Sequence, residues 1–369
     1  MNLCSEMSDG PTPPISVMEG KGFYNKYAAI PAAGGALALP LLERAAQLID
    51  LDKGDRPIVI ADYGSSEGKN SLAPMRAAIA VLRARVGPKR PILVYHTDLP
   101  ANDFSTLFKV LETDPDSYVR GERNVFPSAI GRSFYQCVLP PNHVDLAWSS
   151  YAAVWLSQIP RQIPDHFFIP YSTGAVRADF DRQAAPDWEA FLSLRAAELR
   201  PGGRLVVALP SLTDDGLTGF APLAPLMDRA NEVLSELVDA GLITSEERGQ
   251  MTLASCPRRE SDLLAPFAKR GEFHRLVVEY CTTSAGADTI WDEYQLDKDA
   301  EALAKKRALF FRAIFVPSLA QALGPTRGVE ERQAFSAALE LGLQRRMVDH
   351  PARLENPVGM IVLAKQGAE

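Results

Sequence analysis

The sequence predicts an α/β protein, a doubly wound parallel sheet with a helical cap. Two observations carry this prediction. Over residues 21–215, short continuous apolar runs alternate with helical patterns, which is typical of parallel strands buried on both faces. Beyond them this rhythm breaks, and long amphipathic helical patterns dominate. The length of 369 residues suits one such fold with a large insertion.

We expect each part of the chain to take the following place. A flexible leader, residues 1–20, is rich in Pro, Ser and Gly. In the cofactor-binding α/β core, residues 21–215, the expected strands are 57–64, 91–99, 144–150 and 204–210, and the expected helices are 32–50, 70–86, 103–112 and 188–199. The helical cap over an acceptor pocket is expected at 216–255 and 296–350, with helices over 223–240, 296–323 and 329–348. Residues 256–295 and 351–369 return to the core sheet, with strands at 273–281 and 360–365.

Composition and charge exclude several classes of partner. The formal net charge is -7, so the surface repels phosphate backbones and gives no support for binding nucleic acid or anionic membranes. No apolar run approaches the ~20 residues that span a bilayer, and the N-terminus carries no secretory signal pattern. We therefore expect a cytoplasmic protein. The cysteines have no C-x-x-C spacing and the five histidines no metal-ligand spacing, so we expect no metal site.

The segment ADYGSSEGKN, residues 61–70, is the sharpest local signal. A buried strand enters a turn with Gly64 and Gly68, and a helix begins directly after it. Glycines let a ligand approach the backbone, and the helix N-terminus suits an anionic group such as the carboxylate of S-adenosylmethionine or a pyrophosphate. Asp62 stands at the carboxyl end of the strand, where such sheets bind ligands. An ordinary strand-to-helix turn explains the same pattern.

Asp98 follows the second expected strand, in HTDLPANDF. An acid at this place can accept both hydroxyls of a ribose, as it does in nucleotide-binding sheets. The alternative is a helix N-cap or turn residue. Farther on, a buried strand ends in Ser149, Ser150 and Tyr151, and Trp155 follows. Its indole N–H can hold a carboxylate oxygen while the ring walls a pocket, although by itself the residue is more simply explained as a core residue on an amphipathic helix.

Taken in order, ADYGSSEGKN, DLPANDF, SFY and SSYAAVWLSQIP resemble the plant SABATH family. Its members are the salicylate, benzoate, jasmonate and indole-acetate carboxyl methyltransferases and their N-methylating relatives of the caffeine pathway. The resemblance begins at MEGKGFYNKY, residues 18–27, and passes through PGGRLVV, GLITSEE and RAIFVPSLAQALG. It ends at NPVGMIVLAK, residues 356–365, and so covers nearly the whole chain.

The resemblance implies a class I methyltransferase fold, a Rossmann-like doubly wound sheet with a cap. It implies S-adenosyl-L-methionine as cofactor and the carboxylate of a small aromatic or aliphatic acid as acceptor. With Gly64, the implied cofactor-binding residues are Tyr24, Asp62, Asn70, Asp98, Leu99, Ser133, Phe134 and Ser149. Asp98 would bind the ribose, while Ser133 and Phe134 would flank the adenine. The implied acceptor site consists of Pro31, Tyr151, Val154, Trp155, Leu226, Met227, Phe311 and Ile314, with Leu354 less surely placed. Trp155 would take the catalytic role of orienting the acceptor, in a chain that forms a homodimer.

Three positions depart from the family pattern. Pro31 stands where carboxyl-methylating members have a Gln that helps Trp155 to hold the carboxylate, and proline has no side-chain donor. Ala28 replaces a cofactor-contacting Ser, and Met227 replaces an aromatic cap residue. Either another group holds the carboxylate, or the methylated atom is a nitrogen, a hydroxyl oxygen or a carbon.

Two further alternatives stay open on the sequence alone. A nicotinamide-dependent oxidoreductase uses a related sheet, although the closely spaced G-x-G-x-x-G pattern is absent here. The second alternative is a binding protein that has kept the fold but catalyses no reaction, because a fold does not imply a function.

Overall fold

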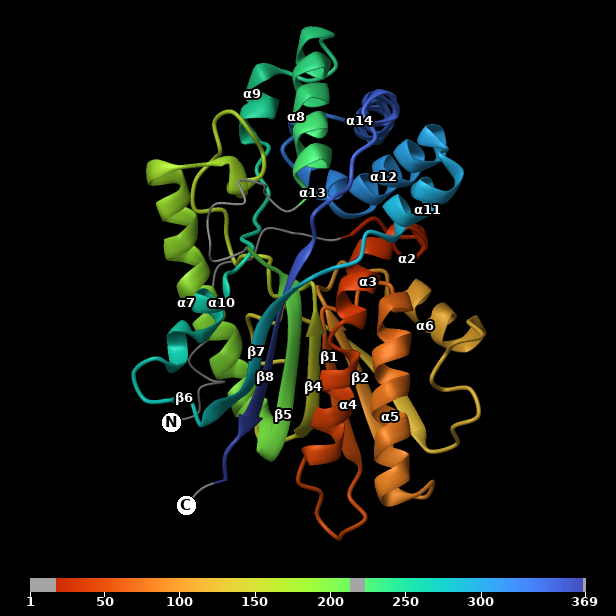
Figure 1. The fold of residues 1–369 in the computed structure, drawn as a ribbon, viewed down its shortest axis with the longest axis vertical. Coiled ribbons are helices and arrows are strands. Elements are labelled where there is room, and N and C mark those ends of the chain that lie inside the picture. Colours follow the sequence, from red (N-terminus) through yellow and green to blue (C-terminus); the bar gives the residue numbers. More distant parts are fainter. Residues whose placement is uncertain (1–17, 213–222, 368–369) are drawn as a thin grey trace.

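The computed structural model describes residues 18–212 and 223–367. Within them, eight strands form one sheet in the order β3-β2-β1-β4-β5-β8-β7-β6 (Figure 1). The strands are β1 (Ile58–Tyr63), β2 (Ile92–Asp98), β3 (Val125–Gly131), β4 (Val144–Ser150), β5 (Leu199–Pro210), β6 (Glu272–Phe273), β7 (Leu276–Ala285) and β8 (Pro357–Lys365). The first five pair in parallel, and β8, β7 and β6 add to the edge in antiparallel pairing. The predicted doubly wound α/β fold is confirmed.

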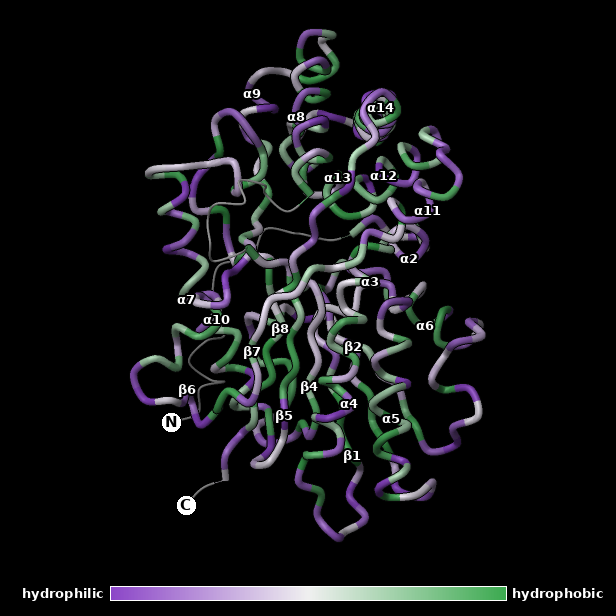
Figure 2. Tube along the Cα trace, in the orientation of Figure 1, coloured by the Kyte–Doolittle hydropathy of each residue, from purple (hydrophilic) through white to green (hydrophobic). Residues whose placement is uncertain are grey.

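Alternate residues of each strand pack against different helical layers. Ile58 and Ile60 belong to the core beneath α4 (Leu39–Leu48), α5 (Leu72–Val86) and α6 (Phe104–Thr113). Val59 and Ala61 face the opposite layer, which includes α7 (Gly174–Glu198). Both faces are therefore covered, which explains the continuous apolar runs of the strands. Figure 2 shows hydrophobic colours concentrated along these central strands.

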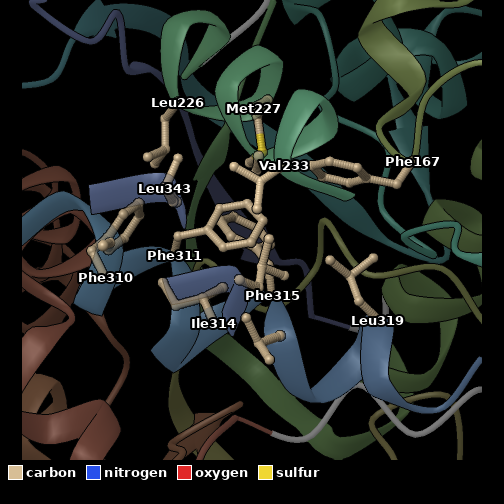
Figure 3. Close-up of a cluster of buried hydrophobic side chains, with 14 of the residues drawn as sticks. Phe167, Leu226, Met227, Val233, Phe310, Phe311, Ile314, Phe315, Leu319 and Leu343 are labelled. Carbon is tan, nitrogen blue, oxygen red and sulfur yellow. The ribbon is translucent and has the colours of Figure 1, made fainter. Parts of the chain in front are cut away.

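A cap of helices lies over the carboxyl ends of the parallel strands (Figure 1). It comprises α8 (Ala224–Asp239), α9 (Ser245–Gln250), α11 (Thr289–Asp297), α12 (Ala300–Ile314), α13 (Val316–Ala320) and α14 (Val329–Asp349). Four of them, α8, α12, α13 and α14, share a core that includes Phe310, Phe311 and Phe315 (Figure 3). Between cap and sheet lie α2 (Phe23–Tyr27) and α3 (Ala29–Ala36), and α10 (Glu260–Leu264) lies beside the core.

The structure differs from the expected elements at several places. The helix expected over 188–199 begins at Gly174, and the one expected over 32–50 is divided into α3 and α4. The cap begins its second part at Thr289, before the expected residue 296. Strand β3 and helix α2 were not predicted, since β3 is a partly exposed edge strand and α2 has five residues. Both are too short or too mixed for a periodic pattern.

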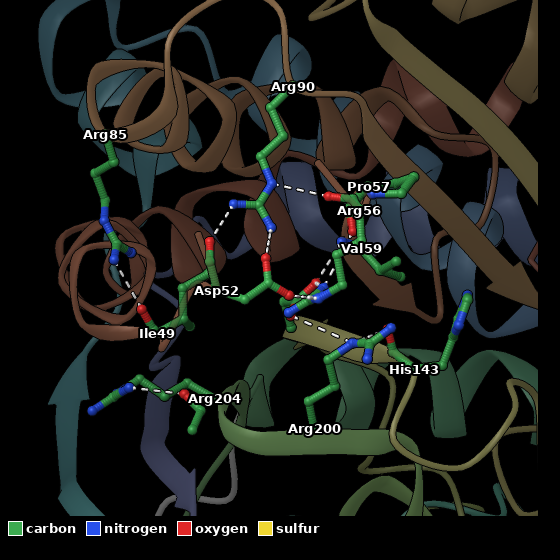
Figure 4. Close-up of polar contacts among 12 residues, drawn as sticks. Ile49, Asp52, Arg56, Pro57, Val59, Arg85, Arg90, His143, Arg200 and Arg204 are labelled. Carbon is green, nitrogen blue, oxygen red and sulfur yellow. Dashed lines mark hydrogen bonds and ion pairs between the residues drawn. The ribbon is translucent and has the colours of Figure 1, made fainter. Parts of the chain in front are cut away.

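Charged side chains occupy the opposite end of the sheet, where the parallel strands begin. Arg56, just before β1, pairs with Asp145 of β4 at 2.8 Å, and Asp145 also accepts the N–H of Val59 at 2.9 Å. Arg56 and Arg90 both bind Asp52 (Figure 4). This network ties the amino ends of the central strands together. The ligand-binding end of the sheet is the other one.

Among the described residues, no helix combines the length and apolar character that a membrane crossing requires.

Candidate active site

A cavity of about 650 Å³ lies at the carboxyl ends of the parallel strands. The loops after β1, β2, β3 and β4 all contribute to its wall, because parallel strands end at the same edge of the sheet. The cavity also lies at the point where the order of the strands in the sheet reverses, since β2 and β4 flank β1 on opposite sides. Its lining residues are Met18, Tyr24, Gly64, Ser66, Asp98, Leu99, Ser133, Phe134, Tyr135, Ser150, Tyr151, Ala152, Trp155 and Leu156. We call this space the polar cavity.

The turn after β1 forms one wall of the polar cavity. Gly64 has φ +87° and donates its N–H to the Thr97 carbonyl at 2.8 Å, so the turn is fastened to β2. A β-carbon at Gly64 would lie 2.1 Å from that of Ala152. Only glycine fits this close approach. The turn thus brings backbone to the cavity, as expected from the sequence.

Asp98 ends β2 and presents its carboxylate to the polar cavity. One oxygen accepts the N–H of Ser66 and the other that of Leu99, each at 2.7 Å. Burial raises the pKa of Asp98 to about 6, although these two hydrogen bonds oppose the shift. Each carboxylate oxygen can accept more than one hydrogen bond, so both can still accept a hydroxyl. The Ser66 hydroxyl is buried without a partner in the described structure. The accepting carboxylate and the neighbouring hydroxyl fit the ribose of a nucleoside.

Asp62 lies beneath the polar cavity rather than in its wall. It is 2% exposed and accepts hydrogen bonds from the Ser71 hydroxyl at 2.5 Å and His96 Nδ1 at 2.9 Å. His96 Nε2 is in turn 2.8 Å from the Tyr118 hydroxyl. Asp62 was expected to touch the cofactor; it is absent from the cavity lining, and its Oδ2 belongs to this buried network. In the structure it supports the turn that carries Gly64.

Asn70 and Ser149 likewise hold lining residues instead of lining the cavity. Asn70 donates to the Ala28 carbonyl at 3.4 Å and hydrogen-bonds the hydroxyl of Tyr24. The Ser149 hydroxyl donates to the carbonyl of Tyr63 at 2.9 Å. Both anchor a neighbouring segment, namely the N-terminal helices and the end of β1.

The helix N-terminus after Gly68 is not open to the cavity, contrary to expectation. A short 3-10 helix (Lys69–Ser71) precedes α5, and the Lys69 N–H donates to Asn25 Oδ1 at 3.1 Å. Glu67 accepts the N–H groups of Gly22 and Asn25. The segment 22–25 therefore covers this end of the helix and seals one side of the site.

A second cavity of about 650 Å³ lies under the cap and adjoins the first. The two share Met18, Tyr24, Tyr151 and Trp155. Its other lining residues are Ile30, Pro31, Val154, Phe168, Pro210, Leu223, Ser255, Pro257, Phe310, Ile314, Phe315 and Asn356. None of these described side chains is charged, so we call this space the apolar cavity.

Four of the expected acceptor residues line this apolar cavity besides Trp155, namely Pro31, Tyr151, Val154 and Ile314. Leu226, Met227 and Phe311 do not. They are at most 1% exposed and lie inside the cap core, where Figure 3 shows Phe311 among side chains of α8 and α14. Its neighbour Phe310 lines the cavity instead. Leu354 is also buried in the cap core.

Tyr151 and Trp155 stand where the two cavities meet. Tyr151 has φ +60°, an uncommon conformation for a residue with a side chain, and its hydroxyl donates to Asn356 Oδ1 at 3.1 Å. The carbonyl of Trp155 accepts the Tyr135 hydroxyl at 2.6 Å, which fixes the backbone. The indole N–H of Trp155 has no hydrogen-bond partner among the described residues, so it is free to bind a ligand.

The sequence analysis missed several lining residues. Ser66 lies within the glycine turn and carried a signal, because polar residues there accompany ligand-binding loops. Met18 and Asn356 begin two segments of the family resemblance, but neither was assigned to the site, and Ser255 and Pro257 lie outside every such segment. Only the fold brings these four residues to the site.

Comparison with known proteins decides the family. The family model described as SAM dependent carboxyl methyltransferase matches residues 16–352. The chain belongs to this family. The expected cofactor is therefore confirmed as that of the family.

Individual relatives agree with this assignment. Methyltransferase LUC1 of Fusarium sp. is 31% identical over 252 residues, which are 67% of this chain and 65% of that protein. Gibberellic acid methyltransferase 1 of Arabidopsis thaliana is 28% identical over 351 residues, 87% of this chain and 91% of that protein. For the first fungal relatives, the match spans less than two thirds of their own length, 65% and 60%.

The fold has a solved counterpart. A structure of loganic acid methyltransferase with SAH superposes with a TM-score of 0.72 at 22% identity, and covers 95% of this chain and 99% of the other. At this identity the likeness concerns the fold, and it includes both the sheet and the cap.

Proposed function

We propose that this protein transfers a methyl group from S-adenosyl-L-methionine to the carboxylate of a small, largely apolar acid. The observation that carries the proposal is the pair of joined cavities. One is polar and lies at the carboxyl ends of the strands, the other is apolar and lies under the cap. Such a pair suits a nucleoside in the first and an acceptor in the second. Family membership supports both parts.

In the polar cavity, Asp98 would accept the ribose hydroxyls, and Ser133 and Phe134 would lie against the adenine. Tyr24 and Gly64 would lie closer to the amino acid end of the cofactor. Support comes from their common position on one cavity wall and from the available lone pairs of Asp98. Asp62, Asn70 and Ser149 would act by holding these residues.

When bound, the cofactor supplies a methyl group already activated on a sulfonium. A carboxylate is ionised at neutral pH, so the acceptor needs no general base. The chain has to align the acceptor oxygen with that methyl group, and Trp155 at the junction of the cavities is suited to orient it. The apolar walls replace water around both charges, which favours a reaction that neutralises them.

One observation favours a second candidate, the methylation of a nitrogen, hydroxyl oxygen or carbon. Pro31 lines the apolar cavity and offers no donor to a carboxylate. Names of relatives favour acids, since gibberellic acid and loganic acid methyltransferases are among them.

Transfer of label from tritiated S-adenosylmethionine tests both candidates. The acid panel contains benzoate, indole-3-acetate, jasmonate, gibberellic acid and loganic acid, beside N-heterocycles and phenols. We expect label in an acid as a base-labile methyl ester. Label found only in base-stable products of heterocycles or phenols would replace the carboxylate by the second candidate.

We also propose that the protein acts in the cytoplasm as a homodimer. The family resemblance supports the dimer, and the residue composition is compatible with the location. Light scattering coupled to gel filtration tests the dimer through the molar mass, which would be twice 40.3 kDa.

A further inference from the structure

Ser255 and Trp155 form a cross-strand pair at the apolar cavity. They make an isolated antiparallel bridge, flanked by hydrogen bonds from Leu156 N–H to the Ala254 carbonyl at 2.7 Å and from Cys256 N–H to the Val154 carbonyl at 2.9 Å. The hydrogen bonds join the flanking residues and not the two residues themselves, which defines a non-hydrogen-bonded pair. In this type of antiparallel pair the facing side chains come closest.

The side chains of this pair face the cavity. Their neighbours Leu156, Ala254 and Cys256 pack together in a separate buried cluster with Phe180. Trp155 and Ser255 are absent from that cluster, which indicates that their side chains point away from it. Both line the apolar cavity, in agreement with this direction.

The Ser255 hydroxyl is buried and unused. Ser255 is 4% exposed, and its oxygen has no hydrogen-bond partner in the described structure. Buried hydroxyls are almost always hydrogen-bonded, because an unmet one costs free energy. A ligand group that accepts a hydrogen bond would remove this cost.

One other residue of the cavity has an unmet polar atom, the side-chain nitrogen of Asn356. That nitrogen lies against the backbone of Gly286, where a β-carbon would be 2.6 Å from it. The Asn356 oxygen accepts the Tyr151 hydroxyl. Asn356 therefore fixes Tyr151 and is turned toward Gly286, which leaves the Ser255 hydroxyl, on the residue paired with Trp155, without a partner in the described structure.

We infer that Ser255 is a specificity-determining residue, whose hydroxyl donates a hydrogen bond to the acceptor carboxylate beside the indole N–H of Trp155. This rests on the carboxyl methyl transfer proposed above. Two neutral donors side by side match the two oxygens of a carboxylate. They also suit a cationic cofactor, because an Arg or Lys at this place would repel the sulfonium across a cavity of low dielectric. Pro31, which lines the same cavity, has no side-chain donor to add.

Calorimetry on the full chain saturated with S-adenosylhomocysteine tests the inference. Each acid of the panel is titrated beside its methyl ester, which lacks the charge. We expect Ser255→Ala to weaken binding of the acid about tenfold or more, the usual effect of a hydrogen bond to a charged group. Binding of the ester should change less than about threefold, and Ser255→Thr, which keeps the hydroxyl, should retain the preference for the acid.

Ser318→Ala is the matched control. It also removes a buried hydroxyl without a partner, from α13, and Ser318 lines neither cavity. It should leave both affinities unchanged. Urea midpoints close to that of the parent chain would show that each variant is folded.

The outcomes separate the two proposals. If the parent chain binds S-adenosylhomocysteine and none of the acids, carboxyl methyl transfer and the role of Ser255 both fail. If the parent chain binds acids and Ser255→Ala binds them equally well, the role of Ser255 alone is overturned. A rise in KM for the acid in Ser255→Ala, with kcat nearly unchanged, would support it.

Discussion

A β-carbon on Gly64 would lie 2.1 Å from the β-carbon of Ala152. The turn after β1 and the loop after β4 thus meet in direct contact, and both residues line the polar cavity. The closeness follows from the fold, because β1 and β4 are adjacent parallel strands that end at the same edge. The contact limits which residues this wall of the site can contain.

We expect Gly64→Ala to lower the free energy of unfolding by roughly 2–4 kcal/mol, from strain at positive φ and from overpacking. Binding of S-adenosylhomocysteine should weaken at least tenfold. Gly241→Ala is the control, since Gly241 has φ +70° with no atom near the new methyl group, so it reports the strain alone. Adding Ala152→Gly to Gly64→Ala should restore part of the loss. Equal losses for Gly64→Ala and Gly241→Ala in urea unfolding would contradict the contact.

The pH dependence of cofactor binding should follow Asp98, whose pKa is raised to about 6. Below this pH the carboxylate is protonated and can no longer accept both ribose hydroxyls. The dissociation constant of S-adenosylhomocysteine should therefore rise about tenfold per pH unit below 6. Asp98→Asn should bind weakly with a flat profile between pH 5 and 7. A flat profile in the parent chain would remove Asp98 from the site.

In the chain without ligand, protonation of Asp98 should stabilise the folded state, whereas it should weaken cofactor binding. Its pKa is higher in the folded than in the unfolded chain, so the folded state binds the proton more tightly. The stabilisation is complete below the unfolded pKa of about 3.9 and is lost as the pH rises through about 6. From pH 5 to 7, the unfolding free energy of the parent chain should therefore fall relative to that of Asp98→Asn, as urea titrations would reveal.

Trp155 should separate acceptor chemistry from cofactor binding. Trp155→Phe keeps a ring and removes the free indole N–H, so kcat/KM for an acid should fall roughly 10- to 100-fold, as expected for a lost hydrogen bond to a charged group. Trp155→Ala should lose acceptor turnover entirely. Both variants should bind S-adenosylhomocysteine within about threefold of the parent chain. Parent-like turnover by Trp155→Phe, measured as methyl ester formed, would count against the indole as the donor.

The sequence predicted the core of the fold because burial dictates the pattern there. All six residues of β1 are buried, and the first four, residues 58–61, form the apolar run on which the prediction rested. Edge strand β3 escaped prediction, since it alternates between buried and exposed positions and contains Pro127. Helix α7 was expected to begin at Trp188, but it continues through Pro186 from Gly174. Tertiary packing here overrides the usual effect of proline.

The polar cavity was more predictable than the apolar one, for a geometric reason. Parallel strands bring their carboxyl ends together, so Gly64 and Asp98 could be grouped from the order of strands alone. Ser133 follows the unpredicted strand β3, and only the family resemblance indicated it. The apolar cavity depends on the rotation of helices in the cap. In the run LFFRAIF, nearly every position is apolar, so the sequence does not reveal that Phe310 faces the cavity and Phe311 the cap core.

The cap should depend on one buried ion pair. Asp288, the N-cap of α11, binds Arg307 of α12, and the two side chains are 2% and 0% exposed. Asp288 also accepts the N–H of Leu354 at 2.8 Å, on the segment that leads into β8. Burial lowers the pKa of Arg307, which reflects the cost of the charge when it is removed from water.

Asp288→Ala would leave the guanidinium of Arg307 buried without its counter-charge, and we expect a loss of about 3–5 kcal/mol in the free energy of unfolding. Asp288→Ala with Arg307→Met should lose less than Asp288→Ala alone, because the stranded charge is then gone. Glu293→Ala is the surface control, since Glu293 of α11 and its partner Lys306 of α12 are 55% and 48% exposed, and the loss should be much smaller. If the double variant were less stable than Asp288→Ala, Arg307 would stabilise the cap through contacts other than this pair.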